Sequence, residues 1–226
     1  MSLQDVVVIW LDGTFEGDNY QKMKDEFNQK IGSTAASTSS NDIDSLICKE
    51  TKEDLITNGA PVITVSTSEE AFREIENHSE AKIFFISSGS LGKDMVPKIV
   101  RQYPLMHSFY IFCFKMTKHA DWALDYTNCL QMFDHPIDLL VRLMRDISTY
   151  FIEQGKLYLE VNDPHNALKY FKHAWNLETR ANEKDKVPPN TKNKEKHVVQ
   201  RDYRIRLDLL EGNNGLIRRA EMALDK

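Results

Sequence analysis

The sequence has few cysteines and no long apolar run. Its three cysteines, Cys48, Cys113 and Cys129, are an odd number at wide spacing, which indicates reduced thiols and excludes a disulfide framework. No apolar run approaches the roughly 20 residues that span a bilayer. The N-terminal residues MSLQDVVVIW have no basic region ahead of a hydrophobic core. The sequence therefore predicts a cytoplasmic protein with neither a membrane span nor a signal peptide.

The sequence also lacks an excess of positive charge. Its 226 residues carry 29 Lys and Arg against 34 Asp and Glu, which gives a formal net charge of −5. Nucleic-acid-binding chains are usually basic, so nucleic acid is not an expected partner. The hydrophobic share of 41% and the charged share of 28% are ordinary for a globular protein. The length suits one large domain or a domain with an appendage.

Local signals for catalysis and for metal binding are missing too. None of the seven histidines is paired with another His or Cys at metal-ligand spacing. Cys113 lies within an apolar run, and Cys129 has no basic neighbour that would activate it. Neighbouring residues do not assemble a nucleophile, a base and an orienting acid. The sequence favours a protein that is not an enzyme and leaves that question open.

Apolar runs of strand length alternate with helical patterns through the first part of the chain. The central stretch, residues 81–100, reads AKIFFISSGSLGKDMVPKIV: an apolar run, a turn of small residues, then apolar residues at helical spacing. Such runs predict five strands, at Val6–Leu11, Val62–Val65, Ile83–Ile86, Phe109–Phe114 and Leu130–Phe133. Helices are predicted at 18–31, from an N-cap at Ser68 to about His78, after Gly92, and at 118–126.

This alternation predicts an α/β fold. Short connections and right-handed crossovers favour a parallel sheet with helices on both faces. We expect a five-stranded flavodoxin-like sheet with strand order 2-1-3-4-5. In that order the carboxyl ends of the first and third strands flank one crevice, where open α/β sheets commonly bind ligands.

From Ile137 onward the pattern is purely helical. A long apolar stripe is followed by the turn Asn162-Asp163-Pro164 and by a second helix. The small and aromatic residues of this hairpin fall close to those of a tetratricopeptide repeat; they are Gly155, Tyr158, Ala167, Phe171 and Ala174. We expect residues 1–135 to form the α/β domain, with a flexible insertion at 32–60 that holds at most a short helix over Ile43–Leu55. Residues 136–226 should form a helical extension with a disordered linker at 183–196 and a last helical stretch broken by Gly212 and Gly215.

The candidate ligand site is the turn after the third strand together with Asp12, which ends the first strand. The turn comprises Ser87, Ser88, Gly89, Ser90, Gly92 and Lys93. Exposed amides at a helix start attract anions, and Lys93 adds positive charge, so a nucleotide phosphate would suit this crevice. The glycine spacing matches neither the P-loop nor the dinucleotide fingerprint. Small residues are also what a tight turn requires, so both interpretations stay open.

Two further features of the sequence each have a functional and a structural interpretation. Asp12 has no second carboxylate beside it, so the sequence predicts no divalent cation and no phosphotransfer, and Asp12 is readily explained as a turn or capping residue. The second helix of the hairpin has a basic polar side, formed by Lys169, Lys172, His173, Arg180 and Lys184. A solvated face explains this side more simply than a surface for an acidic partner, which is the alternative.

Three stretches together resemble a known module. VVVIWLDG, AKIFFISSGSLGKDMVPKI and SFYIFCF followed by HADWA look like the Toll/interleukin receptor-like, flavodoxin-like α/β module at the front of many bdelloid rotifer proteins. In those proteins it precedes arginine ADP-ribosyltransferase domains or kinesin-light-chain-like tetratricopeptide arrays. The glutamate-x-glutamate signature of the transferases has no counterpart here, nor do the tryptophan and glutamate of NAD-cleaving Toll-like domains. The resemblance therefore implies architecture without transferring either activity.

These observations lead to two functional hypotheses. The favoured one is a non-catalytic protein-interaction or scaffolding module of an intracellular signalling-type protein, which binds a protein partner or a neighbouring domain. It expects no cofactor. The alternative is a Toll-like domain that binds or hydrolyses a nucleotide of the NAD or ADP-ribose class in the crevice. A second carboxylate in that crevice would separate the two hypotheses, and the sequence shows none. The oligomeric state is left open.

Overall fold

The computed structural model describes residues 5–11, 52–103, 108–113, 115–185 and 207–225. The chain divides into two compact units, residues 1–135 and 136–226, and each is described by itself. The predicted helix at 18–31, residues 32–51 of the predicted insertion, Phe114 and residues 186–196 of the predicted linker lie outside the described residues.

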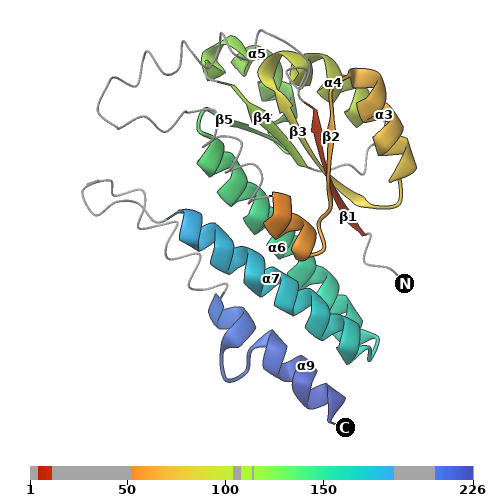
Figure 1. Ribbon diagram of the computed structural model, residues 1–226, viewed down its shortest axis with the longest axis vertical. Coiled ribbons are helices and arrows are strands. Elements are labelled where there is room, and N and C mark those ends of the chain that lie inside the picture. The colour runs from red at the N-terminus through yellow and green to blue at the C-terminus, as the bar shows by residue number, and fades with distance from the viewer. Residues whose placement is uncertain (1–4, 12–51, 104–107, 114, 186–206, 226) are drawn as a thin grey trace, which may run out of the picture. The chain divides into compact units, whose positions relative to one another are not determined.

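The first unit is built on a five-stranded parallel sheet (Figure 1). Its strands are β1 (Val6–Leu11), β2 (Val62–Val65), β3 (Lys82–Ser88), β4 (Ser108–Phe112) and β5 (Leu130–Phe133). The strand order is β2-β1-β3-β4-β5, and each adjacent pair is parallel. The predicted α/β fold class and strand order are therefore confirmed. β3 begins one residue before the predicted run and ends two residues after it, so the strand includes Ser87 and Ser88.

Both faces of this sheet are buried, as expected for parallel strands. On one face the strands form a core with α3 (Ser68–Asn77) and α4 (Gly89–Gln102), and Phe85 meets Phe109 edge to face at 6.0 Å between ring centroids. On the other face Phe84 and Tyr110 are equally buried, with ring centroids 6.4 Å apart. The unbroken apolar runs of the sequence reflect this burial on both sides.

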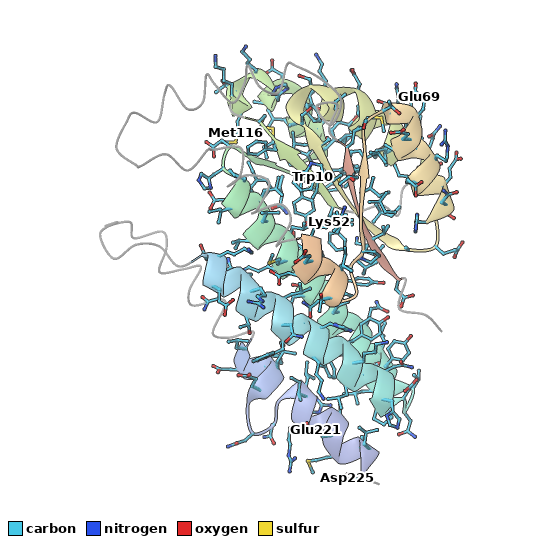
Figure 2. All side chains as sticks on the ribbon, in the orientation of Figure 1. Trp10, Lys52, Glu69, Met116, Glu221 and Asp225 are labelled. Atoms are coloured by element: carbon cyan, nitrogen blue, oxygen red, sulfur yellow. The ribbon has the colours of Figure 1, made fainter. Side chains whose placement is uncertain are left out.

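Helix α3 begins one residue earlier than predicted, because Thr67 and not Ser68 is the N-cap. The Thr67 hydroxyl accepts from the Glu70 amide at 3.2 Å, and the Glu70 carboxylate accepts from the Thr67 amide at 3.2 Å. This reciprocal capping box satisfies two amides that the helix itself leaves free. The same carboxylate also accepts from the Ser66 amide at 2.9 Å, and these backbone hydrogen bonds lower the pKa of Glu70. Glu69, labelled in Figure 2, adds a second acid to this first turn.

The predicted flexible insertion does not extend over its last nine residues, 52–60. Residues 52–57 are helical, beginning at Lys52 (Figure 2). The Ala60 amide donates to the Leu55 carbonyl at 2.9 Å, and the Gly59 amide donates to the Ile56 carbonyl at 3.1 Å. With Gly59 at a φ of 80°, these bonds form a Schellman cap, which a residue with a Cβ would strain. The pair Asn58-Gly59 was the sequence signal for this helix end, and Leu55 is buried.

The segment between β4 and β5 forms three short turns instead of the single helix predicted at 118–126. They are η2 (Met116–Lys118), α5 (Ala120–Ala123) and η3 (Leu124–Tyr126). Ala123 lies in the core, and Trp122 packs against it. Beyond Tyr126, the Cys129 amide donates to the Tyr126 carbonyl at 3.0 Å and leads the chain into β5.

The second unit contains α6 (Pro136–Glu160), α7 (Pro164–Lys184) and α9 (Leu216–Leu224). α7 packs against both α6 and α9 and lies between them (Figure 1). Gly155 of α6 lets the Phe171 ring approach so closely that an added Cβ would overlap it. The buried Ser148 hydroxyl donates to the Ala174 carbonyl at 3.1 Å and ties the same two helices together. The predicted helical hairpin is therefore present.

The connection between α6 and α7 follows the sequence signal. Asn162 has a φ of 60°, and Asp163 is the N-cap ahead of Pro164. The Asp163 carboxylate accepts from the Asn166 side chain at 2.6 Å and from its amide at 3.1 Å, and these bonds lower the pKa of Asp163. At its other end α7 continues through Lys184, so the predicted linker does not begin at residue 183.

Candidate functional site

The predicted crevice has one described wall, at the carboxyl end of β3. Ser87 pairs with Leu11 of β1 in the parallel register, so both strands end at the same edge of the sheet. Asp12 follows Leu11 and lies outside the described residues. The structure therefore describes the residues contributed by β3 and α4, and Asp12 stays a prediction.

The residues expected to form an open turn are instead the end of a strand and the first turn of α4. Ser88 is the N-cap, and its hydroxyl accepts from the Leu91 amide at 3.4 Å. Ser90 and Lys93 are exposed on the helix surface. One of the free amides at the helix start is thus already used by the Ser88 side chain.

The two glycines of this turn are required by packing. A Cβ on Gly92 would lie 2.6 Å from Cδ1 of Ile111 and 2.9 Å from the Ser87 hydroxyl oxygen. A Cβ on Gly89 would lie 2.6 Å from Nε2 of His119. Both glycines are buried. Close approach of α4 to β3, β4 and the His119 ring therefore explains both, without a ligand.

Among the predicted site residues that the structure describes, Ser87 alone combines burial with an unsatisfied polar atom. It is 1% exposed, and its hydroxyl has no hydrogen-bond partner among the described residues. The Gly92 contact places this hydroxyl beneath the first turn of α4, between helix and sheet. It is covered there and cannot meet a ligand at the helix surface.

His119 also lies at this edge of the sheet, and the sequence did not predict that it would. Its ring lies over Gly89, and its Nδ1 accepts from the Trp122 indole N–H at 3.4 Å. Trp122 in turn contacts Tyr126, with ring centroids 6.4 Å apart. The spacing of three and four residues between these aromatics was the available signal. Contact with Gly89 was not predictable, because it joins segments 30 positions apart in the chain.

The described residues offer no metal centre and no activated thiol. Within that part of the chain, no group of three or more His, Cys, Asp or Glu side chains is placed to hold a metal ion. Burial raises the pKa of the Cys113 thiol, with Asp134 adding to the effect, and burial also raises the pKa of the Cys129 thiol. Both cysteines are therefore less reactive than a free thiol.

The second unit presents a shallow, open depression along α7, which we call the α7 groove. It has a volume of about 310 Å³ and is lined by His165, Leu168, Lys169, Lys172, His173 and Asn176. These residues recur every three or four positions, on the side of α7 opposite the buried Ala167, Phe171 and Ala174. The basic side that the sequence indicates thus coincides in part with a concave surface.

The charge in this groove comes from two exposed lysines. Among the described residues, neither Lys169 nor Lys172 forms an ion pair or a hydrogen bond. His173 is half-buried against the Phe151 ring, with centroids 6.0 Å apart. Burial lowers the pKa of His173, and the nearby Lys169 lowers it further. Arg180 and Lys184 lie outside the groove, and Arg180 pairs with Glu183 at 3.0 Å.

Comparisons with known proteins give this chain no relative. Family models, curated proteins and solved structures were searched, and none of them matches. The resemblance to the Toll-like module therefore stays a prediction. In the described parts of the chain, no helix has both the length and the apolar character that crossing a membrane requires. The class that fold and site define is an α/β protein with a parallel five-stranded sheet and a helical C-terminal unit that carries a cationic groove.

Proposed function

We propose that the protein is a non-catalytic protein-interaction module and that the α7 groove is its binding surface. The observation that carries this proposal is the pair Lys169 and Lys172, which line a concave surface and have no acidic partner among the described residues. Exposed lysines on a flat face are common. Their coincidence with a hollow that also contains Leu168 makes this face the best candidate for recognition.

At the carboxyl edge of the sheet, packing and capping explain the residues of the predicted site. Gly89 and Gly92 are accounted for by the neighbours they touch, and the Ser88 hydroxyl caps its own helix. A helix start alone favours anions in general and selects no particular ligand. The polar residues of the crevice therefore support the nucleotide-binding alternative less than their sequence pattern suggests.

Site-specific crosslinking tests the interaction. A photoreactive amino acid at Leu168 should give discrete adducts with a partner in cells, whereas the same group at the exposed Lys98 of α4 should not. Each adduct is then identified, and the purified partner is titrated against the purified chain by calorimetry. The proposal is supported if the purified partner binds the unmodified chain saturably and if crosslinking at Leu168 prevents this binding. Equal adducts at both positions, or no binding by the purified partner, contradict it.

Nucleotide titration tests the alternative. We expect NAD, ATP and ADP-ribose to leave the melting temperature unchanged. A ligand at a hundred times its dissociation constant adds roughly 2.7 kcal/mol, enough to raise the melting temperature by several degrees. A saturable rise that Lys93→Ala abolishes would replace the interaction module with a nucleotide-binding protein and direct attention to turnover.

A further inference from the structure

We infer that the α7 groove binds an acidic peptide segment in extended conformation, with two carboxylates two residues apart. This inference deepens the proposed function and rests on it, because it names the chemistry of the partner. It is argued from the charge, the spacing and the size of the groove.

The charge of the groove selects an anion. From Pro164 to Leu177 the sequence of α7 contains no acidic residue, and the groove is lined by two lysines and two histidines. The Lys169 and Lys172 ammonium groups have no carboxylate to satisfy them among the described residues. A carboxylate that enters the groove gains two charge-assisted contacts without breaking an existing ion pair.

The spacing of the lysines fits a carboxylate pair on an extended chain. Residues three apart on a helix have Cβ atoms about 5–6 Å apart. Alternate side chains of an extended chain point the same way, and at about 3.3 Å per residue they lie about 7 Å apart. Two flexible lysines on successive turns can therefore meet the side chains of an acidic-x-acidic sequence, whereas adjacent acids would point to opposite sides.

The size of the groove limits the segment to a few residues. From His165 to Asn176 the lining covers eleven helical steps, about 16 Å at 1.5 Å per residue. An extended peptide covers that distance with about five residues. The volume of about 310 Å³ lies at the lower end of the range for ligand sites, roughly 300–1,000 Å³. Leu168 and the lysine stems add apolar surface beside the charges.

Other anionic partners fit less well. Strong nucleic-acid binding needs many phosphate contacts, and two lysines supply few. The chain as a whole is acidic, at −5, which opposes a polyanionic duplex or an anionic membrane. A short acidic peptide avoids most of this long-range repulsion because it carries little charge outside the groove.

The experiment is a fluorescence-polarisation titration of the full chain with labelled peptides. The probe carries Glu-Ser-Glu in a Gly-Ser frame; the matched peptides carry Gln-Ser-Gln, or Glu-Glu-Ser with the same charge. The groove variant is Lys169→Glu/Lys172→Glu. The control is Lys98→Glu/Arg101→Glu, which makes the same charge change at the same spacing on exposed positions of α4. A neutralising variant, Lys169→Gln/Lys172→Gln, serves if the reversal variant fails to fold by circular dichroism.

We expect the Glu-Ser-Glu peptide to bind and the Gln-Ser-Gln peptide not to bind. The groove variant should weaken binding by about tenfold, because two attractions become two repulsions, while the control should change it by less than about twofold. Glu-Glu-Ser should bind more weakly than Glu-Ser-Glu. Raising the salt concentration should weaken the interaction, since exposed charges are screened.

Four outcomes would overturn the inference. Equal weakening by the groove and control variants would show attraction by net charge alone, and equal affinity of Glu-Ser-Glu and Glu-Glu-Ser would remove the assigned geometry. Tighter binding of a single-stranded oligonucleotide, lost in the groove variant, would make this a nucleic-acid surface. Concentration-dependent sedimentation, also lost in that variant, would make a second copy the occupant.

The failure of this inference differs from the failure of the proposed function. If no acidic peptide binds while crosslinking from Leu168 still yields a partner that binds when purified, the module stands and only the partner's chemistry is wrong. If neither peptide nor partner binds, both are overturned.

Discussion

The two units of the chain differ in the sign of their charge and in where their polar groups go. Residues 1–135 carry 12 Lys and Arg against 20 Asp and Glu, a net charge of −8. Residues 136–226 carry 17 against 14, a net charge of +3. In the first unit, the polar residues at the end of β3 cap a helix or lie under it; in the second, two lysines on α7 have no described partner.

This contrast indicates which unit offers a free surface for recognition. A parallel sheet is buried on both faces, so only strand ends and connections meet solvent, and here the Ser87–Gly92 connection serves the packing of α4. A helix of a hairpin buries one side and leaves the other for solvent or for a partner. The described residues of the predicted site in the α/β unit are thus explained by packing, whereas no packing contact among the described residues accounts for the pair Lys169 and Lys172 on α7.

The largest effect should come from the sheet core. Phe85→Ala should lower the free energy of unfolding of the α/β unit by about 3–5 kcal/mol, because it empties a fully buried aromatic site. Chemical denaturation followed by tryptophan fluorescence measures the change. A midpoint equal to that of the wild type would mean that this sheet is not the core of the unit.

The next effect compares the close-approach glycines of the two units. Gly155→Ala and Gly92→Ala should each destabilise by about 0–2 kcal/mol: overpacking costs about 1–3 kcal/mol, and alanine's helix propensity returns about 1 kcal/mol. The exposed neighbours provide matched controls, and Lys156→Ala and Lys93→Ala should stay within about 0.5 kcal/mol. The stability of each variant is measured from its denaturation midpoint. A stabilised Gly92→Ala variant would show that α4 can move away from Ile111.

Two buried serines sharpen the comparison further. Ser148→Ala should cost about 0.5–1.5 kcal/mol, because it removes the hydrogen bond to the Ala174 carbonyl. Ser87→Ala should be neutral or stabilising, because the Ser87 hydroxyl is buried with no partner in the described part of the chain. Urea unfolding of both variants tests the contrast. A loss at Ser87 as large as that at Ser148 would indicate a role for the Ser87 hydroxyl that packing does not explain.

The smallest effect concerns pH and the helical unit. Burial and Lys169 hold the folded-state pKa of His173 below its ordinary value of 6.5, so the unfolded chain binds the proton more readily. Stability from this group is complete above the unfolded pKa and is lost as pH falls from about 6.5 toward the folded value. His173→Gln should therefore reduce the loss of stability between about pH 7.5 and 5.5. Thermal unfolding of the wild type and of His173→Gln across this pH range measures the difference. Identical pH dependence of the two melting temperatures would contradict a lowered pKa of His173.

Local structure was predicted correctly from the sequence for several segments. The apolar runs at Val6–Leu11 and Val62–Val65 are confirmed as strands β1 and β2, and the fold class and strand order are confirmed with them. The turn at Asp163-Pro164 starts a helix as predicted. Errors of one residue, such as Ser68 for Thr67, arise because neighbouring hydroxyl residues compete for one capping position. The sequence allowed a short helix over Ile43–Leu55; the described helix lies at 52–57, two residues past the end of that range, because it runs on to the cap at Gly59.

Hydrophobic spacing and caps act over a few residues, so the residue pattern alone predicts a parallel α/β sheet followed by a helical hairpin. The roles of the polar residues depend on the folded arrangement. This arrangement brought His119 against Gly89 and Ile111 against Gly92, and it made a concave surface of the basic side of α7. Those facts depend on contacts between segments far apart in the chain, which no local pattern of residues encodes.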